Sequence, residues 1–451
     1  MAKAAVKTKA AKAKPPMIAT ALSVGAASAG ARVRMYRVGF GDFFLFTIRG
    51  ADGGPLHILV DCGVHAANLG SIGAAIDQLA VDTDRKLALV IMTHRHADHI
   101  SGFATGKDAF AKFTVERVWM PWFENKTNPA AIKIQAGLVD LATEIHAKLT
   151  ARAGPGDDDL SRMVTNITGG PVGNAVALAV LHGGFKTAAP VDYYQAGDVA
   201  MLPQSLIDAG LKATILGPPI DPDLIAEMDG KSHQYLDAVQ RADTAPPQTP
   251  FASAFLANEG AYPAAAFQLF DPEALEQRIH AGQPDVLAAT ANRADKTINN
   301  QSLMVLFEVA GRTLLFAGDA QWGNWQNFLF GGALGSVGHT AMTAQAKDIL
   351  GNLDFYKVGH HGSTNATPID MVNAMRQGCV CMCSTEPGAY GSVKNASEVP
   401  RGPLLDALSK KSGGLFARSD QVALQSAKAI DTPLSPAFKA PTGLLYIDYE
   451  F

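Results

Sequence analysis

Short hydrophobic runs that end in polar residues recur along the first third and the last third of the chain. The clearest covers residues 87–92, where six consecutive apolar residues predict a strand that is buried on both faces. Similar runs predict further strands at residues 33–36, 43–48, 57–60, 115–120, 302–308, 313–317, 355–358, 379–383 and 444–448. Residues 70–82 show helical spacing between two of these strands. Strands with helices between them predict a layered α/β or α+β domain.

The pattern changes between residues 121 and 290. Residues 138–149 carry leucines and an isoleucine at helical spacing, whereas residues 153–159 and 245–250 are rich in Gly, Asp or Pro and predict loops. We interpret this region as an insertion or lid that carries several helices. The chain then divides into an N-terminal arm at 1–32, the first half of the domain at 33–120, the insertion at 121–290, and the second half with a C-terminal strand at 291–451.

Composition and charge narrow the class of protein only slightly. The 451 residues are 47% hydrophobic, enough for a sizeable core, and the net charge of −4 gives no global signal for nucleic acid or a membrane surface. Five lysines within residues 1–16 predict a disordered basic arm, and residues 17–31 weakly resemble the apolar part of a signal peptide. We therefore expect a cytoplasmic protein, with secretion, for example to the periplasm, as the alternative. No stretch of about 20 apolar residues predicts a membrane span, and the sequence does not indicate an oligomeric state.

The ends of four predicted strands carry residues that bind metal ions. The strand at 87–92 leads into a segment with three histidines and an aspartate, and the other strand ends supply two more aspartates and a pair of histidines. Imidazole nitrogens and carboxylate oxygens are ligands that Zn²⁺ and similar ions prefer. Ligands at several strand ends suit a site with two ions about 3.5–4 Å apart; a solvated polar loop is the alternative. The candidates are His94, His96, Asp98, His99, Asp61, Asp319, His360 and His361.

The spacing of these residues resembles a known superfamily. The motifs at 94–99, 318–319 and 361–362 resemble those of the metallo-β-lactamase superfamily, over residues 33–390 apart from the insertion. The segments at 38–42, 59–63, 299–303, 315–319 and 357–363 are similar to the hydrolase domain of DNA-uptake competence proteins (ComEC-like), a subgroup with phosphodiesterase-like members. The resemblance implies an α+β fold, namely a four-layer αββα sandwich with a large, partly helical insertion.

The resemblance also implies a role for each ligand. His94 and His96 would hold one divalent ion, Asp98, His99 and His361 a second, and Asp319 would bridge the two. Zn²⁺ is the expected metal. The expected catalytic groups are Asp98, Asp319 and His360, where His360 would contact a substrate phosphate or support a ligand.

Several neighbouring residues are expected to support this centre. Asp61 would orient a ligand imidazole, and Asp42 lies in a Gly-flanked turn near the site. Asn299 and Asn300 stand where most of the superfamily has a third histidine for the first ion, so that this ion would be held more loosely, or would be Mn²⁺. Ser363 would either bind phosphate through its hydroxyl or begin a helix as its N-cap.

These features predict an enzyme. We expect a binuclear metal-dependent hydrolase that uses a metal-bound hydroxide on a phosphodiester such as a nucleotide, a nucleic acid or a phosphocholine-like ester. Hydrolysis of a lactone or carboxylic ester on the same two-metal core is the first alternative. A binding module that kept the fold and lost most of its catalytic power is the second.

Overall fold

The computed structural model describes residues 30–65, 71–137, 174–235, 297–386, 398–421, 433–440 and 445–451. The predictions for residues 1–29, for a helix at 138–149, and for loops at 153–159 and 245–250 lie outside these ranges.

The first sheet has seven strands in the order β13-β1-β2-β3-β4-β5-β6. Neighbouring strands from β13 to β3 pair antiparallel, and those from β3 to β6 pair parallel. At its outer edge, the C-terminal strand returns to β1, where Arg34 makes two hydrogen bonds of 2.7 Å to Asp448. The strands are β1 (Ala31–Tyr36), β2 (Phe43–Arg49), β3 (Pro55–Cys62), β4 (Lys86–Ile91), β5 (Thr114–Pro121), β6 (Val191–Tyr194) and β13 (Tyr446–Glu450).

The second sheet has six strands in the order β12-β11-β10-β9-β8-β7. β7, β8 and β9 pair antiparallel, and β9 to β12 pair parallel. The strands are β7 (Lys212–Gly217), β8 (Met304–Val309), β9 (Arg312–Phe316), β10 (Phe355–Lys357), β11 (Val380–Cys383) and β12 (Phe416–Arg418).

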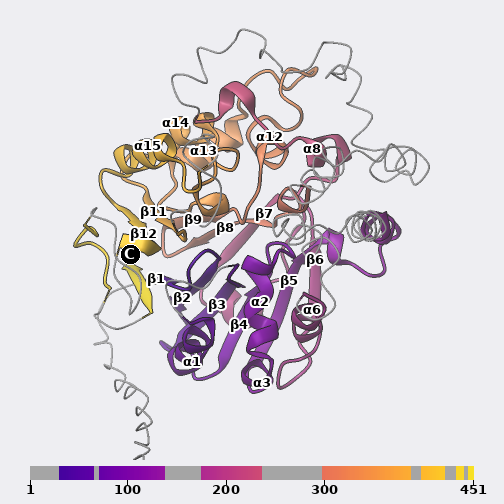
Figure 1. Cartoon of the computed structure of the whole chain (residues 1–451), viewed down its shortest axis with the longest axis vertical. Coiled ribbons are helices and arrows are strands. Elements are labelled where there is room, and N and C mark those ends of the chain that lie inside the picture. Colours follow the sequence, from indigo (N-terminus) through magenta and orange to yellow (C-terminus); the bar gives the residue numbers. More distant parts are fainter. Residues whose placement is uncertain are drawn as a thin grey trace, which may run out of the picture.

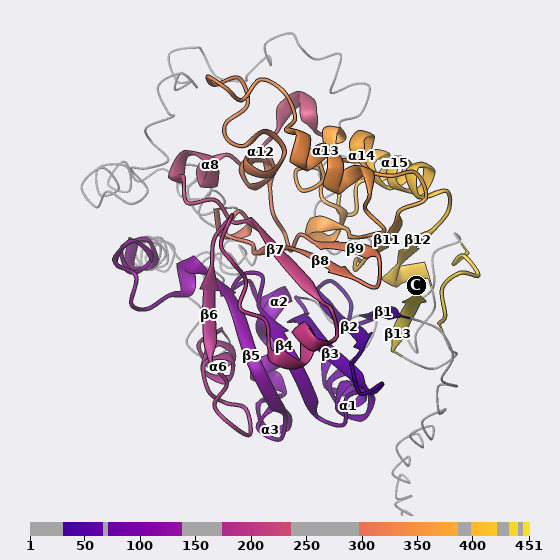
Figure 2. The same cartoon turned by 180° about the vertical axis from the view of Figure 1, so that it is seen from behind.

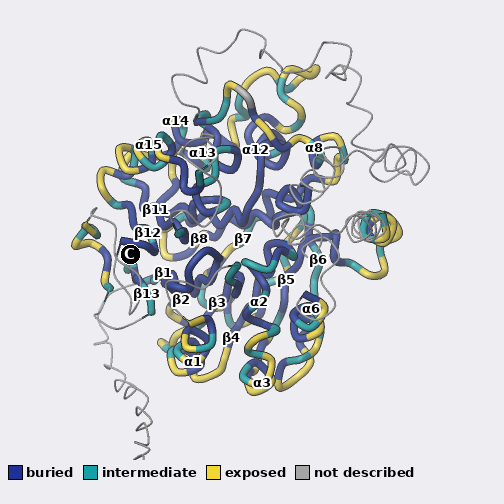
Figure 3. The backbone as a smooth tube through the Cα atoms, in the orientation of Figure 1, coloured by how far each residue is buried: buried dark blue, intermediate teal, exposed yellow. Residues whose placement is uncertain are grey.

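Helices cover the outer face of each sheet (Figures 1 and 2). An apolar core fills the space between the two sheets, where the rings of Phe46 and Phe307 lie 5.6 Å apart, and a further core lies beneath each helical layer. Figure 3 shows the buried strands between helices with exposed outer faces. The first sheet carries α1 (Ile72–Asp82), α2 (Ala97–Thr105), α3 (Lys107–Phe110) and α6 (Ala175–Leu181), and the second carries α12 (Trp322–Phe330), α13 (Ala344–Gly351), α14 (Ile369–Ala374) and α15 (Gly402–Ser412). This αββα arrangement confirms the predicted fold class.

Part of the region that we expected to be an insertion belongs to the sandwich. β6 extends the first sheet beside β5, and β7 extends the second sheet beside β8. Along the chain, the short helix α7 (Gln204–Asp208) lies between β6 and β7, and α8 (Pro222–Ala226) follows β7. The expected insertion at 121–290 is therefore corrected for residues 191–217. The sequence gives little sign of β6 because this strand has four residues, of which three are only half-buried.

The carboxyl ends of β3, β4, β9 and β10 meet at one edge of the sandwich. Side chains that follow these strands contact one another, as described below. In open α/β sheets, this edge is where ligands usually bind. Among the described helices, none is long and apolar enough to cross a membrane.

Candidate metal centre

The histidine-rich segment begins where β4 ends. Residues 92–96 continue without regular structure, and α2 starts directly afterwards with His96 at its N-cap position. Asp98 and His99 therefore lie in the first turn of a helix. The N-terminal end of a helix also favours the negative charge of Asp98. This helix has only nine residues, too few for a clear helical pattern in the sequence.

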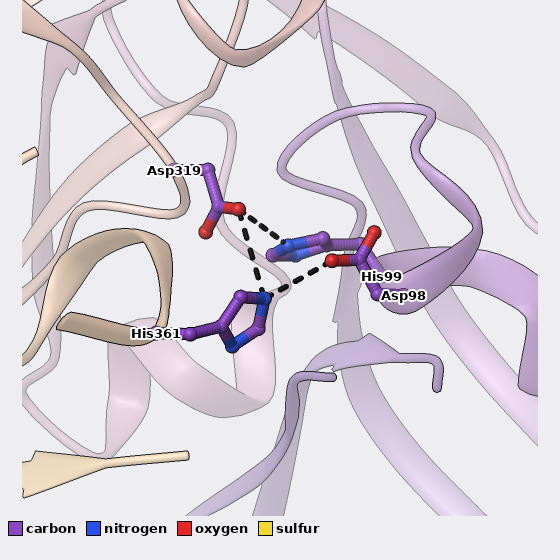
Figure 4. A group of neighbouring side chains, drawn as sticks. All are labelled: Asp98, His99, Asp319 and His361. Atoms are coloured by element: carbon purple, nitrogen blue, oxygen red, sulfur yellow. Dashed lines mark hydrogen bonds and ion pairs between the residues drawn. The ribbon is translucent and has the colours of Figure 1, made fainter. Parts of the chain in front are cut away.

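Four side chains from three segments converge on one point, and we call them the quartet: Asp98, His99, Asp319 and His361. One donor atom of each lies within 4.8 Å of the others (Figure 4). His99 Nε2 lies 3.0 Å from Asp319 Oδ2, and His361 Nε2 lies 3.1 Å from Asp98 Oδ2. His361 Nε2 is also 3.8 Å from Asp319 Oδ2.

The quartet fits a divalent metal ion. His99 Nε2 and Asp319 Oδ2 are buried and 3.0 Å apart, yet neither has a partner with hydrogen-bond geometry among the described residues. Buried polar atoms normally have such a partner. Two imidazole nitrogens and two carboxylate oxygens form a donor set that Zn²⁺ accepts, and a shared cation would serve as a common partner for His99 Nε2 and Asp319 Oδ2.

Asp319 lies near both histidines of the quartet. It follows β9 through Gly318, which has a φ of +53° and would bring a Cβ atom to 2.8 Å from Thr93 Cβ. Glycine tolerates both this left-handed backbone and this close approach. The Asp319 N–H donates to Ser302 Oγ over 3.1 Å, and its Oδ1 accepts a hydrogen bond of 3.1 Å from His360 N–H.

The two histidines after β10 have unusual backbone conformations. His360 and His361 have φ values of +46° and +53°, a left-handed region that is costly for residues other than glycine. Such strain is retained mainly at functional sites. His361 Nδ1 lies 2.9 Å from the carbonyl oxygen of Ser384 and donates to it, which leaves Nε2 with a lone pair directed at the quartet. The ring of Phe40 packs against His361 at a centroid distance of 4.2 Å.

Asp61 supports His99 from behind. Its Oδ1 accepts a hydrogen bond of 2.8 Å from Thr93 N–H, and its Oδ2 accepts from Thr93 Oγ1 at 2.6 Å and from His99 Nδ1 at 2.7 Å. This geometry holds a proton on His99 Nδ1 and leaves His99 Nε2 available to an ion. The role that we predicted for Asp61 is therefore geometrically possible.

His94 and His96 form a separate pair beside the quartet. His94 Nε2 lies 3.1 Å from His96 Nδ1, and the rings of His94 and His99 are 4.1 Å apart. His94 Nδ1 lies 3.3 Å from Ser302 Oγ. Among the described residues, His94 and His96 belong to no group of three His, Cys, Asp or Glu donors within 4.8 Å.

The two asparagines that replace the expected third histidine behave differently. The Asn300 side-chain amide donates to the carbonyls of Ile225 and Glu227, and its oxygen accepts from the backbone N–H groups of Gln321 and Asn324. Asn300 therefore connects α8 with the start of α12. Asn299 Oδ1 is buried and has no hydrogen-bond partner among the described residues, so it is the amide oxygen that remains available to an ion.

Lys357 belongs to the motif at 357–363, but the sequence predicts no role for it. Its Nζ donates to the Gly318 carbonyl over 3.0 Å, forms a short ion pair with Asp42 Oδ2, and lies 3.6 Å from Asp319 Oδ1. Asp42 in turn has carboxylate oxygens 3.6 Å from His361 Nδ1 and 3.7 Å from His99 Nδ1. Burial opposes a charge on Lys357, but Asp42 and Asp319 outweigh it and raise the pKa of this ammonium above its usual value.

The electrostatics of the quartet favour a bound cation. Burial opposes the charged forms of all four members. For Asp98 and Asp319, the nearby histidines of the quartet outweigh burial and hold the pKa values of both carboxyl groups well below the usual range. Burial likewise opposes protonation of His99 and His361, and nearby carboxylates, Asp319 foremost, raise their pKa values. The carboxylates of the quartet are thus ionised and attract positive charge. Burial, together with His99, lowers the pKa of His94, so His94 stays neutral, the form that binds a metal ion.

Ser363 does not begin a helix. α14 starts at Ile369 with Pro368 in the N-cap position, so the helix-cap interpretation of Ser363 is wrong. The Ser363 hydroxyl donates to Asn365 Oδ1 over 3.0 Å. Its alternative role in binding phosphate stays a prediction.

Two solved structures to which the chain is similar are a metallo-beta-lactamase fold protein and a beta-lactamase domain protein. A scan of protein-family models and a search of curated proteins gave no match. The chain is similar to the metallo-beta-lactamase fold protein YhfI from Bacillus subtilis, with 10% identity and a TM-score of 0.32 over 88% of this chain and 98% of that one. It is also similar to a beta-lactamase domain protein from Burkholderia ambifaria, with 18% identity and a TM-score of 0.22 over 42% of this chain and 45% of that one. At these scores the likeness assigns no activity to this chain, and the narrower competence-type resemblance stays a prediction.

Proposed function

We propose that this protein is a metal-dependent hydrolase with two divalent ions, Zn²⁺ foremost and Mn²⁺ as the alternative, and that its substrate is a phosphodiester. The convergence of the quartet carries the proposal. Four ligand-type side chains, separated by up to 263 residues in the sequence, point at one another, and two of their buried atoms lack hydrogen-bond partners within the described part of the chain. A structural role explains neither the number of these groups nor their burial.

Each group has a proposed task. The quartet holds one ion, and His94 and His96 hold the other with Asn299 as a third donor. Asp319 is the shared carboxylate of this proposal: its Oδ2 lies near His99 and His361 of the quartet, and its charge also acts on His94. When bound, such ions lower the pKa of a water molecule toward 7 and stabilise negative charge on a phosphoryl group.

His360 is the proposed substrate contact. Its side chain is 22% exposed, whereas the side chains of Asp319 and His361 are almost fully buried. His360 Nε2 lies 3.9 Å from Asp319 Oδ2, at the border of the metal centre. Burial of its ring lowers the pKa of His360, so the imidazole is neutral near pH 7 and can donate one hydrogen bond to a phosphoryl oxygen.

The choice of a phosphodiester rests on the competence-type motifs in the sequence. A lactone or carboxylic ester is the competing substrate, because the same ligands serve acyl transfer. A binding module is the remaining alternative, supported by the missing third histidine beside His94 and His96.

Replacement of Asp319 tests the proposal. The native protein, loaded separately with Zn²⁺ and Mn²⁺, should hydrolyse bis-p-nitrophenyl phosphate faster than a lactone or p-nitrophenyl acetate. The variant Asp319→Ala should lose this hydrolysis while its circular dichroism spectrum is retained. Asp77→Ala, at an exposed position of α1, is the matched control and should keep full activity.

The outcomes separate the three functions. Faster hydrolysis of the lactone or the acetate would support the ester alternative. A native protein that binds neither metal and cleaves none of the substrates would support the binding module. Undiminished phosphodiesterase activity in Asp319→Ala would refute the shared-carboxylate role.

A further inference from the structure

The metal centre contains a buried ammonium group. The side chain of Lys357 is 2% exposed, and it lies on the last residue of β10, next to the segment that carries His360 and His361. Lysine is almost never fully buried unless it is paired. Here its partners are Asp42, the Gly318 carbonyl and Asp319. Each of them belongs to the metal centre or adjoins it.

The two oxygens of Asp319 have different surroundings. Oδ1 lies 3.6 Å from Lys357 Nζ and accepts the 3.1 Å hydrogen bond from His360 N–H. Oδ2 faces the imidazoles, 3.0 Å from His99 Nε2 and 3.8 Å from His361 Nε2. A carboxylate that is held through one oxygen presents the other in a fixed direction.

We propose that Lys357 is a positioning residue for Asp319: by engaging Oδ1, it presents Oδ2 to the ions. This inference rests on the proposed function, because it assigns Lys357 to the same metal centre. Lys357 also carries a positive charge beside Asp42, whose oxygens lie near the Nδ1 atoms of His99 and His361. Those Nδ1 atoms already donate to Asp61 and to the Ser384 carbonyl. The positive charge of Lys357 thus neutralises Asp42. Neither imidazole has to turn toward Asp42, and both can keep Nε2 directed at the ion.

The charges of the site agree with this role. Asp42, Asp61, Asp98 and Asp319 bring four carboxylates together around the quartet. Two divalent ions with one hydroxide would supply three positive charges, and Lys357 would supply the fourth. Without Lys357, the fully loaded site would carry one uncompensated negative charge in a buried environment, which is costly.

The experiment measures binding of Co²⁺ alone, because the intensity of its d–d absorption bands reports the geometry of its ligands. The simple variant Lys357→Met removes the ammonium partner of the buried Asp42 carboxylate, which can prevent folding. The informative pair is therefore Asp42→Asn and the double variant Asp42→Asn/Lys357→Met. Their difference reports the two remaining contacts of Lys357, with Asp319 and with the carbonyl of the adjoining Gly318. Lys86→Met, whose side chain is 74% exposed in β4, is the control for loss of a lysine.

We expect the double variant to bind Co²⁺ about 10–100-fold more weakly than Asp42→Asn, as is typical when the support of a metal ligand is removed. Its d–d spectrum should change as well, whereas Lys86→Met should match the native protein in both readouts. A double variant that retains the native circular dichroism spectrum and binds Co²⁺ like Asp42→Asn, with the same bands, overturns the proposal. So does a native protein that binds no Co²⁺. A native protein that binds Co²⁺ but cleaves no phosphodiester refutes the proposed substrate and leaves the test of Lys357 intact.

Discussion

The contact between Asp61 and His99 makes a sharp prediction about the variant Asp61→Asn. An asparagine has nearly the same shape as the aspartate, but one of its two terminal atoms becomes an NH₂ donor. Asp61 Oδ1 faces the backbone N–H of Thr93, which cannot change from donor to acceptor. The amide oxygen must therefore occupy this position, and the NH₂ group then points at His99 Nδ1. Thr93 Oγ1 can adapt, because a hydroxyl both donates and accepts.

The expected consequence is a change of tautomer at His99. Nδ1 would have to accept a hydrogen bond, and the proton would move to Nε2, the atom that faces Asp319 Oδ2 at 3.0 Å. A protonated Nε2 has no lone pair for a metal ion. Loss of support for a ligand histidine weakens metal binding by about 10–100-fold, which corresponds to about 1.4–2.8 kcal/mol. The fold should survive, since both contacts with Thr93 are kept.

The assay is a titration of Zn²⁺ into the metal-free protein in competition with a chromogenic chelator. Asp52→Asn is the matched control, because Asp52 accepts a hydrogen bond from Gly54 N–H in an exposed turn remote in sequence from the ligands. The control should bind Zn²⁺ as the native protein does. Equal Zn²⁺ affinity in Asp61→Asn and the native protein would show that Asp61 does not set the tautomer of His99.

Two further predictions concern stability. Burial, with a smaller effect of Arg32, lowers the pKa of His57 from 6.5 to about 4, so the unfolded chain binds a proton that the folded protein does not bind as the pH falls from 6.5 to 4. His57 should thus lower the free energy of unfolding by up to about 3 kcal/mol as the pH falls over that range. In urea unfolding, His57→Gln should therefore lose less stability at acid pH than the native protein. Equal pH dependence of the two proteins would contradict this. Gly63→Ala should cost about 1–3 kcal/mol and lower the Tm, because its Cβ would lie 2.4 Å from the backbone nitrogen of His99. Gly351→Ala, where the Cβ meets open space, should leave the Tm unchanged or raise it, and similar Tm values for the two variants would count against the packing argument.

The sequence predicted the parts of the site that depend on strand ends. The apolar run at residues 87–92 favours a strand in the interior of a sheet, so its end and the candidate ligands beyond it could be located without a structure. The resemblance to the metallo-β-lactamase superfamily is what grouped Asp319 and His361 with Asp98 and His99. The structure brings these four together.

Other features left too little local signal. β6 is short and half-exposed, so its place in the first sheet is determined by β5 and not by its own pattern. Lys357 reads as an ordinary strand residue, because its partners Asp42 and Gly318 are distant in the sequence. The charge of a single lysine in a strand does not indicate whether it faces solvent or a cluster of carboxylates. That information exists only once the fold is formed.

The contrast between Asn299 and Asn300 shows how the structure divides a motif that the sequence treats as one unit. Both amides occupy the place of the absent histidine, yet Asn300 uses its NH₂ group and its oxygen to join α8 to α12. Its oxygen already accepts two backbone hydrogen bonds, so it has little capacity left for an ion. Asn299 Oδ1 has no such partner among the described residues. If an amide completes the ligand set of His94 and His96, the physical constraints therefore select Asn299, and the two ions of the proposed centre would be held by unequal donors.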